Sequence, residues 1–263
     1  MPLHTLLASK PFRLFVVLAG FFVANTMLAE FVGIKIFSLE KVLGMEPFDW
    51  TVFGVSGLGF NLTAGVLLWP VVFIMTDIIN EYFGVRSVKL LSYLSVVLVG
   101  YAFVMVYAII GLAPNDWWQS VSGTLSTEDS THIKDMDLAF RKIFGQGLWI
   151  IVGSMVAFLV GQVVDVAVFH RIKKSTGEGK VWLRATGSTL VSQFIDSYLV
   201  LLIAFYIGSD WELVRVLAIG TVNYIYKFVI AIVLTPVIYM AHHYIDKYLG
   251  KSVANRLKSQ AAG

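Results

Sequence analysis

The sequence contains no cysteine, and this absence excludes several kinds of chemistry. Without thiols the 263-residue chain can form no disulfide, no thiolate nucleophile and no cysteine metal site. Charged residues are also scarce: they make up 14% of the chain, against about 25% in a typical soluble domain. Hydrophobic residues instead make up 57%, and the mean hydropathy is +0.77. The sequence therefore predicts a protein embedded in a membrane.

Motifs typical of enzymes and of nucleic-acid-binding proteins are missing as well. The five histidines form no H-E-x-x-H zinc motif, and no glycine-rich phosphate loop occurs. Gly187-Ser188 has no intramembrane histidine to act as its base, and the motifs of an aspartyl intramembrane protease are absent. The net charge of +3 comes from residues at the ends of apolar segments, not from one basic face. We expect no enzyme, no metal, no cofactor and no nucleic-acid partner, and keep a membrane enzyme only as a third class.

Six apolar segments are long enough to cross a bilayer, which takes about 20 residues. They cover residues 12–39, 58–83, 88–112, 143–169, 183–207 and 213–244. An even number of crossings places both termini on one side. Thirteen Lys and Arg flank the segments on that side and six on the other, and Lys227 completes the total of 20. Because basic residues mark the cytoplasmic side, we predict cytoplasmic termini.

The predicted fold is an all-α integral membrane protein, a six-transmembrane-helix bundle that forms a single transport domain over residues 1–263. The first segment exceeds the core of a signal peptide and is expected to be retained. Pro70 and Pro236 are expected to interrupt the second and sixth segments. We predict an irregular loop over 45–59, a mobile outer loop rather than a cap over 113–142, and a basic cytoplasmic helix end after Gly250.

The stretch 183–197, with the sequence LRATGSTLVSQFIDS, has one polar half when it is wound as a helix. A helix in lipid must turn such a face toward protein or a wet cavity. The opposite half is apolar. The polar half consists of Ser188, Thr189, Ser192, Gln193, Asp196 and Ser197.

Two pairs of polar residues fall near the middle of the membrane. At 1.5 Å per residue, Gln193 and Asp196 lie roughly 15–20 Å along the fifth segment. Asn223 and Lys227 are four residues apart at a similar depth in the sixth segment, on one helix face. Because an unpaired ammonium at this depth is costly, we predict that Lys227 pairs with Asp196, with Asp77 or Asp165 as alternatives. A structural ion pair is the competing interpretation.

Further polar residues lie in the first, second and fourth segments. Asp77, Asn80 and Glu81 in the second segment share a face. The motif around Asp77 indicates a functional role, whereas Glu81 could equally be a solvated helix end. Gln162 and Asp165 in the fourth segment could lie at the membrane interface or in the protein interior. In the first segment, the Asn25 amide could simply hold two helices together, and Glu30 is expected near an outer vestibule.

The candidate site therefore combines carboxylates, primary amides and one ammonium. It is edged by Trp69, Phe73, Tyr198, Tyr224 and Tyr226, none of which we assign individually to a ligand. Carboxylates accept hydrogen bonds from ring N–H and amino groups, amides pair with a lactam edge, and aromatic rings stack. This mixture favours a small, flat, polar heterocycle over an inorganic ion, since a cation path would not need the lysine.

Four stretches of the chain resemble the vitamin uptake transporter family, in particular its queuosine-precursor transporters. They are TDIINEYFG at 76–84, GQVVDV at 161–166, WLRATGSTLVSQFIDS at 182–197 and NYIYKFVIAIVLTPVIY at 223–239. They occur in the family's order and at similar spacing. The outer loop 113–142 is long for the family, and Ala185-Thr186 stands where many members carry asparagine. Both departures bear on the choice of substrate.

The resemblance implies an inner-membrane importer of 7-cyano-7-deazaguanine or 7-aminomethyl-7-deazaguanine. Its substrate-binding residues would be Gln193, Asp196, Asn223, Lys227, Gln162, Asp165, Asp77 and Asn25. The family is similar to substrate-binding subunits of energy-coupling-factor transporters, so a vitamin-binding subunit that needs partner ATPases is the alternative. The sequence encodes no ATPase, and we expect none as a partner. The coupling ion and a homo-oligomeric state stay open.

Overall fold

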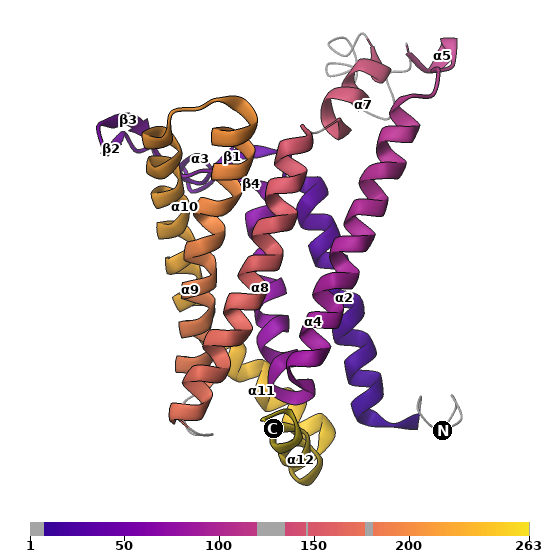
Figure 1. The fold of residues 1–263 in the computed structure, drawn as a ribbon, viewed down its shortest axis with the longest axis vertical. Coiled ribbons are helices and arrows are strands. Elements are labelled where there is room, and N and C mark those ends of the chain that lie inside the picture. Colours follow the sequence, from indigo (N-terminus) through magenta and orange to yellow (C-terminus); the bar gives the residue numbers. More distant parts are fainter. Residues whose placement is uncertain (1–7, 120–134, 146, 177–180, 263) are drawn as a thin grey trace.

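The computed structural model describes residues 8–119, 135–145, 147–176 and 181–262, and most of these residues are helical. Five helical stretches within these ranges are long and apolar enough to cross a membrane. They lie side by side along the long direction of the molecule (Figure 1), as expected of an all-α multi-pass membrane protein. In chain order they are formed by α2 (Lys10–Val32), α4 (Trp69–Ile110), α8 (Leu148–Thr176), α9 (Val181–Leu201) with the π-helix η3 (Leu202–Ile207), and α10 (Leu213–Val233).

Helix α4 reverses its direction within its length. Gly84 has φ 80° and ψ 171°, which breaks the helix in a conformation that favours glycine. Gln162 of α8 accepts a hydrogen bond from Thr76 in the first arm and also lies beside Ser92 in the second. A straight helix would separate Thr76 and Ser92 by about 24 Å, so the two arms must run back past the same residue. Figure 1 shows this reversal at the end of the molecule near α12.

The side chains of the long helices divide into a buried and an exposed set. On the second arm of α4, Val99 and Phe103 are buried and pack with Ile151 of α8. Val97 and Val104 on the same arm are 67% and 66% exposed, although they are fully apolar. An exposed apolar surface of this kind is what a bilayer covers.

The first apolar segment is shorter than the predicted range of 12–39. Helix α2 ends at Val32, and the chain then forms strand β1 (Ile36–Ser38), which pairs antiparallel with β4 (Asn61–Thr63). The β-branched and aromatic run after Gly33 favours a strand over another helical turn. The predicted start of the second segment, residue 58, is also wrong, because this residue lies in a strand. That helix begins only after the 3-10 turn η1 (Ala64–Leu67).

The range 45–59, predicted to be irregular, contains the hairpin of β2 (Trp50–Val52) and β3 (Val55–Leu58). Phe53 and Gly54 both have positive φ, at 53° and 82°, as a tight two-residue hairpin turn requires. Aromatic packing stabilises the hairpin, because the Trp50 ring stacks on Phe48 at 4.9 Å and meets the Phe60 ring edge-on at 5.1 Å. The prediction missed this turn because phenylalanine is rarely found at positive φ.

Helix α3 (Leu39–Val42) anchors the loop that follows the hairpin. Its Glu40 is 3% exposed and accepts a 2.6 Å hydrogen bond from the Phe60 amide and a 2.9 Å bond from the Ser38 hydroxyl. The two sheets and α3 together form one end of the molecule, beside the start of α10 (Figure 1).

The two proline positions behave differently. The sixth apolar segment breaks at Leu234, where α10 stops and α11 (Thr235–Leu249) begins with Pro236 in its first turn, as predicted. Pro70 was expected to kink the second segment, but it lies in the first turn of α4 and starts that helix instead. A first-turn proline loses no helical hydrogen bond, so no kink arises.

The end of the molecule opposite the strands is closed by a polar network. The Tyr82 hydroxyl donates to Asp246 of α11 at 2.6 Å and lies 3.2 Å from Nδ1 of His242. Lys258 of α12 (Lys251–Ala262), the predicted basic helix end, donates to the same Asp246 at 3.0 Å. Burial, reinforced by Lys258, lowers the pKa of His242 to about 4. The beginning of α2 and α12 lie at this same end (Figure 1).

The predicted outer loop over 113–142 is described only in part. It contains the short helix α5 (Asp116–Gln119) and most of α7 (Met136–Phe144). Both lie at the end of the molecule that carries the strands (Figure 1). Residues 120–134 lie outside the described residues, so the choice between a mobile loop and a cap stays a prediction.

Candidate functional site

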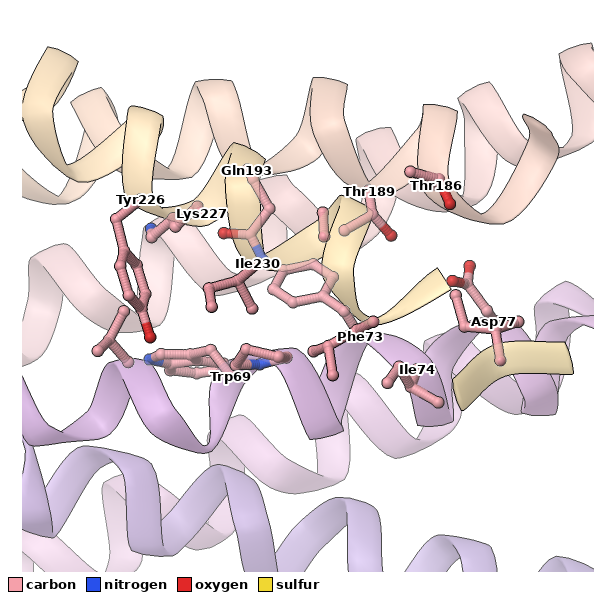
Figure 2. A pocket seen from close by; sticks show the side chains of 15 residues that line it. Trp69, Phe73, Ile74, Asp77, Thr186, Thr189, Gln193, Tyr226, Lys227 and Ile230 are labelled. Atoms are coloured by element: carbon pink, nitrogen blue, oxygen red, sulfur yellow. The ribbon is translucent and has the colours of Figure 1, made fainter. Parts of the chain in front are cut away.

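A pocket lies between the first arm of α4 and helices α9, α10 and α11, and holds about 470 Å³ of space not filled by atoms, part of it open to the outside. Figure 2 shows aromatic rings on one side and polar groups facing them. The residues that matter for the argument are Trp69, Phe73, Asp77, Thr186, Thr189, Gln193, Tyr226, Lys227 and Ile230.

Helix α4 contributes a single face to the pocket. Trp69, Phe73 and Asp77 follow one another at intervals of four residues, which places them above one another on one side of a helix. The helix begins at Trp69, and Pro70 follows in its first turn. The α4 wall therefore changes along its length from aromatic rings to a carboxylate.

Asp77 is the most unusual residue of the pocket. Its side chain is 1% exposed, and neither carboxylate oxygen has a hydrogen-bond partner among the described residues. The Thr189 hydroxyl of α9 faces it, as Figure 2 shows, but does not meet hydrogen-bond geometry. A buried, unsatisfied carboxylate costs several kcal/mol unless something binds it. Asp77 is thus suited to accept hydrogen bonds from a ligand.

Helix α9 presents its polar half to the protein, as predicted. Ser188, Ser192 and Ser197 are at most 1% exposed, whereas Val191 and Phe194 on the opposite half are 43% and 48% exposed. The same half brings three side chains into the pocket at helical spacing, namely Thr186, Thr189 and Gln193. Gln193 is 4% exposed, and its Oε1 has no hydrogen-bond partner among the described residues. The amide is therefore a second group available to a ligand.

The predicted ion pair of segments five and six is present. Nζ of Lys227 on α10 lies 2.5 Å from Oδ2 of Asp196 on α9. The side chains are 13% and 22% exposed, so both keep some access to solvent. Only Lys227 lines the pocket. Asp196 is not part of the pocket lining, and it bears on the pocket by holding the lysine in place.

The sequence left open whether Glu81 is a functional group or a solvated helix end, and the structure places it in neither role. Its side chain is 1% exposed and binds Arg184 of α9 at 2.7 Å and Lys173 of α8 at 3.4 Å. Arg184 and Lys173 belong to the thirteen basic residues counted above as flanking the segments on the cytoplasmic side, yet they are 1% and 7% exposed. The correction has a simple cause: a sequence does not show that residues 103 positions apart meet. The ion pairs of these three residues join α4, α8 and α9.

Gln162 and Asp165 of α8 lie in the interior, at 2% and 0% exposure. Asp165 accepts a 3.2 Å hydrogen bond from Ser192, and its other oxygen has no partner among the described residues. Neither residue lines the pocket, which was expected to contain them. They lie behind it, between α8, α9 and the first arm of α4. Asn80 of that arm contacts Nε2 of His170 at 3.1 Å.

Other predicted residues are not brought to the pocket. The Asn25 amide donates to the Phe21 carbonyl of its own helix at 2.8 Å. Asn223 shares a helix face with Lys227 but is not part of the pocket lining. Glu30 is 8% exposed and accepts a 2.7 Å bond from Ser154, so it joins α2 to α8 rather than facing a vestibule.

The sequence argument missed several pocket residues. Trp69, Phe73 and Tyr226 were noted only as an aromatic edge, although all three line the pocket. Thr186 and Thr189 lie on the polar half of α9, and the helical spacing of Thr186, Thr189 and Gln193 could have indicated them. Tyr198 and Tyr224 belong elsewhere: Tyr198 contacts the Thr221 hydroxyl at 3.0 Å, and Tyr224 packs on Phe194. In the part of the chain described, no three acidic or histidine side chains form a metal site.

Comparison with known proteins identifies the family. The profile of the family described as "Putative vitamin uptake transporter" matches residues 63–241. The "Queuosine precursor transporter" of Escherichia coli is 27% identical over 208 residues, covering 78% of this chain and 84% of the relative. The corresponding "Probable queuosine precursor transporter" of Haemophilus influenzae is 29% identical over 213 residues, covering 78% and 80%. That of Bacillus subtilis is 27% identical over 192 residues, covering 71% and 74%.

No solved structure gives a significant match to the chain. The family profile covers all four stretches on which the resemblance rests, and with them α4, α8, α9, α10 and the whole pocket lining. The chain belongs to the vitamin uptake transporter family.

Proposed function

We propose that this protein imports a 7-deazaguanine precursor of queuosine, 7-cyano-7-deazaguanine or 7-aminomethyl-7-deazaguanine, across the bacterial inner membrane. Three relatives that cover most of the chain are named as transporters of queuosine precursors. The observation that carries the proposal here is Asp77, a buried carboxylate without a hydrogen-bond partner among the described residues, at the end of an aromatic wall.

The chemistry of a deazaguanine fits this pocket. The base is flat, so it can stack on the rings of Trp69 and Phe73. One edge carries a ring N–H and an exocyclic amino group, which together suit the two oxygens of an ionised Asp77. The carbonyl next to this ring N–H can accept from Lys227, which keeps spare N–H donors beside its bond to Asp196.

We further propose that the chain crosses the membrane six times, with the two arms of α4 as separate crossings and both termini in the cytoplasm. The excess of basic residues at the end that carries α12 supports this orientation. The pocket would open alternately to each side, with the break before Pro236 as a flexible point. We expect the protein to work without a partner ATPase and without changing its substrate chemically.

A rescue experiment tests the substrate. Bacteria that can neither make nor import the precursor are given the gene and a low concentration of 7-cyano-7-deazaguanine, and queuosine is then measured in tRNA. We expect queuosine to reappear. Absence of queuosine, with intact protein in the membrane, would refute the assignment. Rescue that depends on added energy-coupling-factor ATPases would instead support the vitamin-binding-subunit alternative.

A further inference from the structure

We propose that Asp77 and Asp165 share a single proton, and that this proton enters the cell together with the substrate. The inference rests on the proposed function, because Asp77 lines the pocket that would hold the substrate. It adds a second transported species, a proton, and a site for it. The site lies between the first arm of α4, α8 and α9.

The two carboxyl groups approach each other from neighbouring helices. Asp77 and Asp165 are 1% and 0% exposed. Their helices meet at the 3.1 Å hydrogen bond from Thr76 to Gln162, and Asp77 directly follows Thr76 while Asp165 comes one helical turn after Gln162. Thr189 of α9 faces Asp77 (Figure 2), and Ser192, three residues further along α9, donates to Asp165 at 3.2 Å. Asp77 faces the pocket, whereas Asp165 lies behind it. The pair therefore connects the substrate position with the interior of the protein.

An independent observation concerns Gln162, three residues before Asp165 and on the same face of α8. It is 2% exposed, and its Oε1 accepts a 3.1 Å hydrogen bond from Thr76, the residue before Asp77. Its Nε2 has no hydrogen-bond partner among the described residues. A buried amide donor next to two carboxyl groups with unpaired oxygens marks a polar site that is incomplete in this structure.

The surrounding charges favour one proton on the pair. The groups that act on Asp77 besides Asp165 are Glu81 on its own helix and Arg184 on α9. Arg184 binds Glu81 at 2.7 Å, so much of its charge is directed there. Lys227 of α10 lines the same pocket but is bound to Asp196. Two facing carboxylates in an interior of low dielectric cannot both stay ionised, so one of them holds a proton.

Serine and threonine hydroxyls stabilise the pair in this state. Ser192 donates to one oxygen of Asp165 at 3.2 Å, and the Thr189 hydroxyl faces Asp77 (Figure 2). Hydroxyls can both donate and accept, so they fit a carboxyl group in either protonation state. A cation such as Na⁺ would be held better by several carbonyl oxygens.

The transport cycle follows from this arrangement. With the proton on Asp165, Asp77 is ionised and accepts hydrogen bonds from the donor edge of the base. When the pocket opens inward, the base leaves and cytoplasmic water reaches the carboxyl pair. In water two neighbouring carboxylates can both be ionised, so the pair then releases its proton to the cytoplasm. No covalent bond to the substrate forms or breaks.

Purified protein in liposomes tests the proposal, with labelled 7-cyano-7-deazaguanine as the probe and the membrane potential clamped at zero. One proton per neutral substrate, across a gradient of about 1.5 pH units with the acid side outside, allows accumulation of up to about 30-fold. We expect accumulation toward this limit, together with proton entry that a trapped pH dye reports when substrate is added.

Two variants separate coupling from binding. We expect Asp165→Asn to keep exchange of labelled for unlabelled substrate within about threefold of wild type and to lose accumulation driven by the pH gradient. Glu30→Gln, at another buried carboxyl group that lies on α2 away from the pocket, is the matched control and should keep accumulation.

The outcomes distinguish this inference from the proposed function. Exchange by the wild-type protein without any response to the pH gradient, or accumulation driven by a Na⁺ gradient, would overturn proton coupling alone. Accumulation by Asp165→Asn equal to wild type would overturn the role of the pair. If the wild-type protein exchanged no substrate at all, both the function and the coupling would be refuted.

Discussion

Asp77 and Glu81 lie one helical turn apart on α4, and both are 1% exposed, but their surroundings are opposite. Glu81 is bound by two cationic side chains. Asp77 has no hydrogen-bond partner for either oxygen among the described residues, and it faces a pocket. Burial alone would group the two residues together. The presence or absence of a partner separates a carboxylate that joins helices from one whose oxygens are available to a ligand.

This difference has an energetic meaning. Removing one member of a buried ion pair leaves the remaining charge uncompensated, at a cost of about 3–5 kcal/mol. Removing a buried group without a partner relieves a cost that the fold already bears. The two residues should therefore respond in opposite ways when each is neutralised, one in stability and the other in transport.

The largest effect is expected from Glu81→Gln. Arg184 and Lys173 would lose the carboxylate that both bind, and folding should weaken by about 3–5 kcal/mol. The amount of folded protein extracted from membranes, measured by size-exclusion chromatography, should fall sharply. A variant that is stable but does not transport would place Glu81 in the binding site and remove the distinction.

The next effect is expected from Asp77→Asn. Loss of charge-assisted hydrogen bonds to the base, at about 3 kcal/mol in total, predicts roughly a 100-fold loss of uptake. The thermal midpoint of the purified protein should stay unchanged or rise, because an unsatisfied buried charge is removed. A clear fall in the midpoint with normal uptake would show that Asp77 is structural.

The Asp196–Lys227 pair lies between these two extremes, because both side chains keep some solvent access. We expect Asp196→Asn to reduce uptake about tenfold through misplacement of Lys227, corresponding to about 1.4 kcal/mol. The double variant with Lys227→Met should recover folded protein but not uptake. Recovery of uptake in the double variant would make the pair purely structural.

A smaller effect is expected from the aromatic wall. Trp69→Ala removes one stacking surface, worth about 0.5–1.5 kcal/mol beyond its area, and should raise KM for uptake about threefold to tenfold while Trp69→Phe restores most of it. Equal uptake by Trp69→Ala and wild type would place the base elsewhere in the pocket.

The smallest effect is expected from Asn25→Leu. Its amide bonds only the backbone of α2, so we expect uptake and the amount of folded protein to change by less than about twofold. A strong loss of uptake would return Asn25 to the site and indicate that α2 moves toward the pocket during transport.

Local periodicity made much of the site predictable. The polar half of α9 follows from helical spacing, and its burial was confirmed. Depth counting predicted that Lys227 and Asp196 meet, and they do. Both arguments need only the rise and turn of a helix in a membrane of known thickness.

The missed features depend on contacts between distant parts of the chain. Arg184 looked like a loop charge because nothing near it in sequence indicates Glu81, 103 residues earlier. The hairpin around Phe53 was missed because phenylalanine is rare at positive φ, and because local spacing does not show that the rings of Trp50 and Phe60 pack together. The placement of Asp165 behind the pocket, rather than in it, depends on how α8 and α9 cross, which residue spacing does not specify.

The central claim is that Asp77 binds the substrate, and direct binding tests it most simply. Labelled 7-cyano-7-deazaguanine is added to purified wild-type protein and to Asp77→Asn, each shown to be folded by its thermal midpoint, and bound label is measured by scintillation proximity. The account predicts saturable binding to wild type and binding about 100-fold weaker to the variant. Equal affinity for both proteins would contradict it.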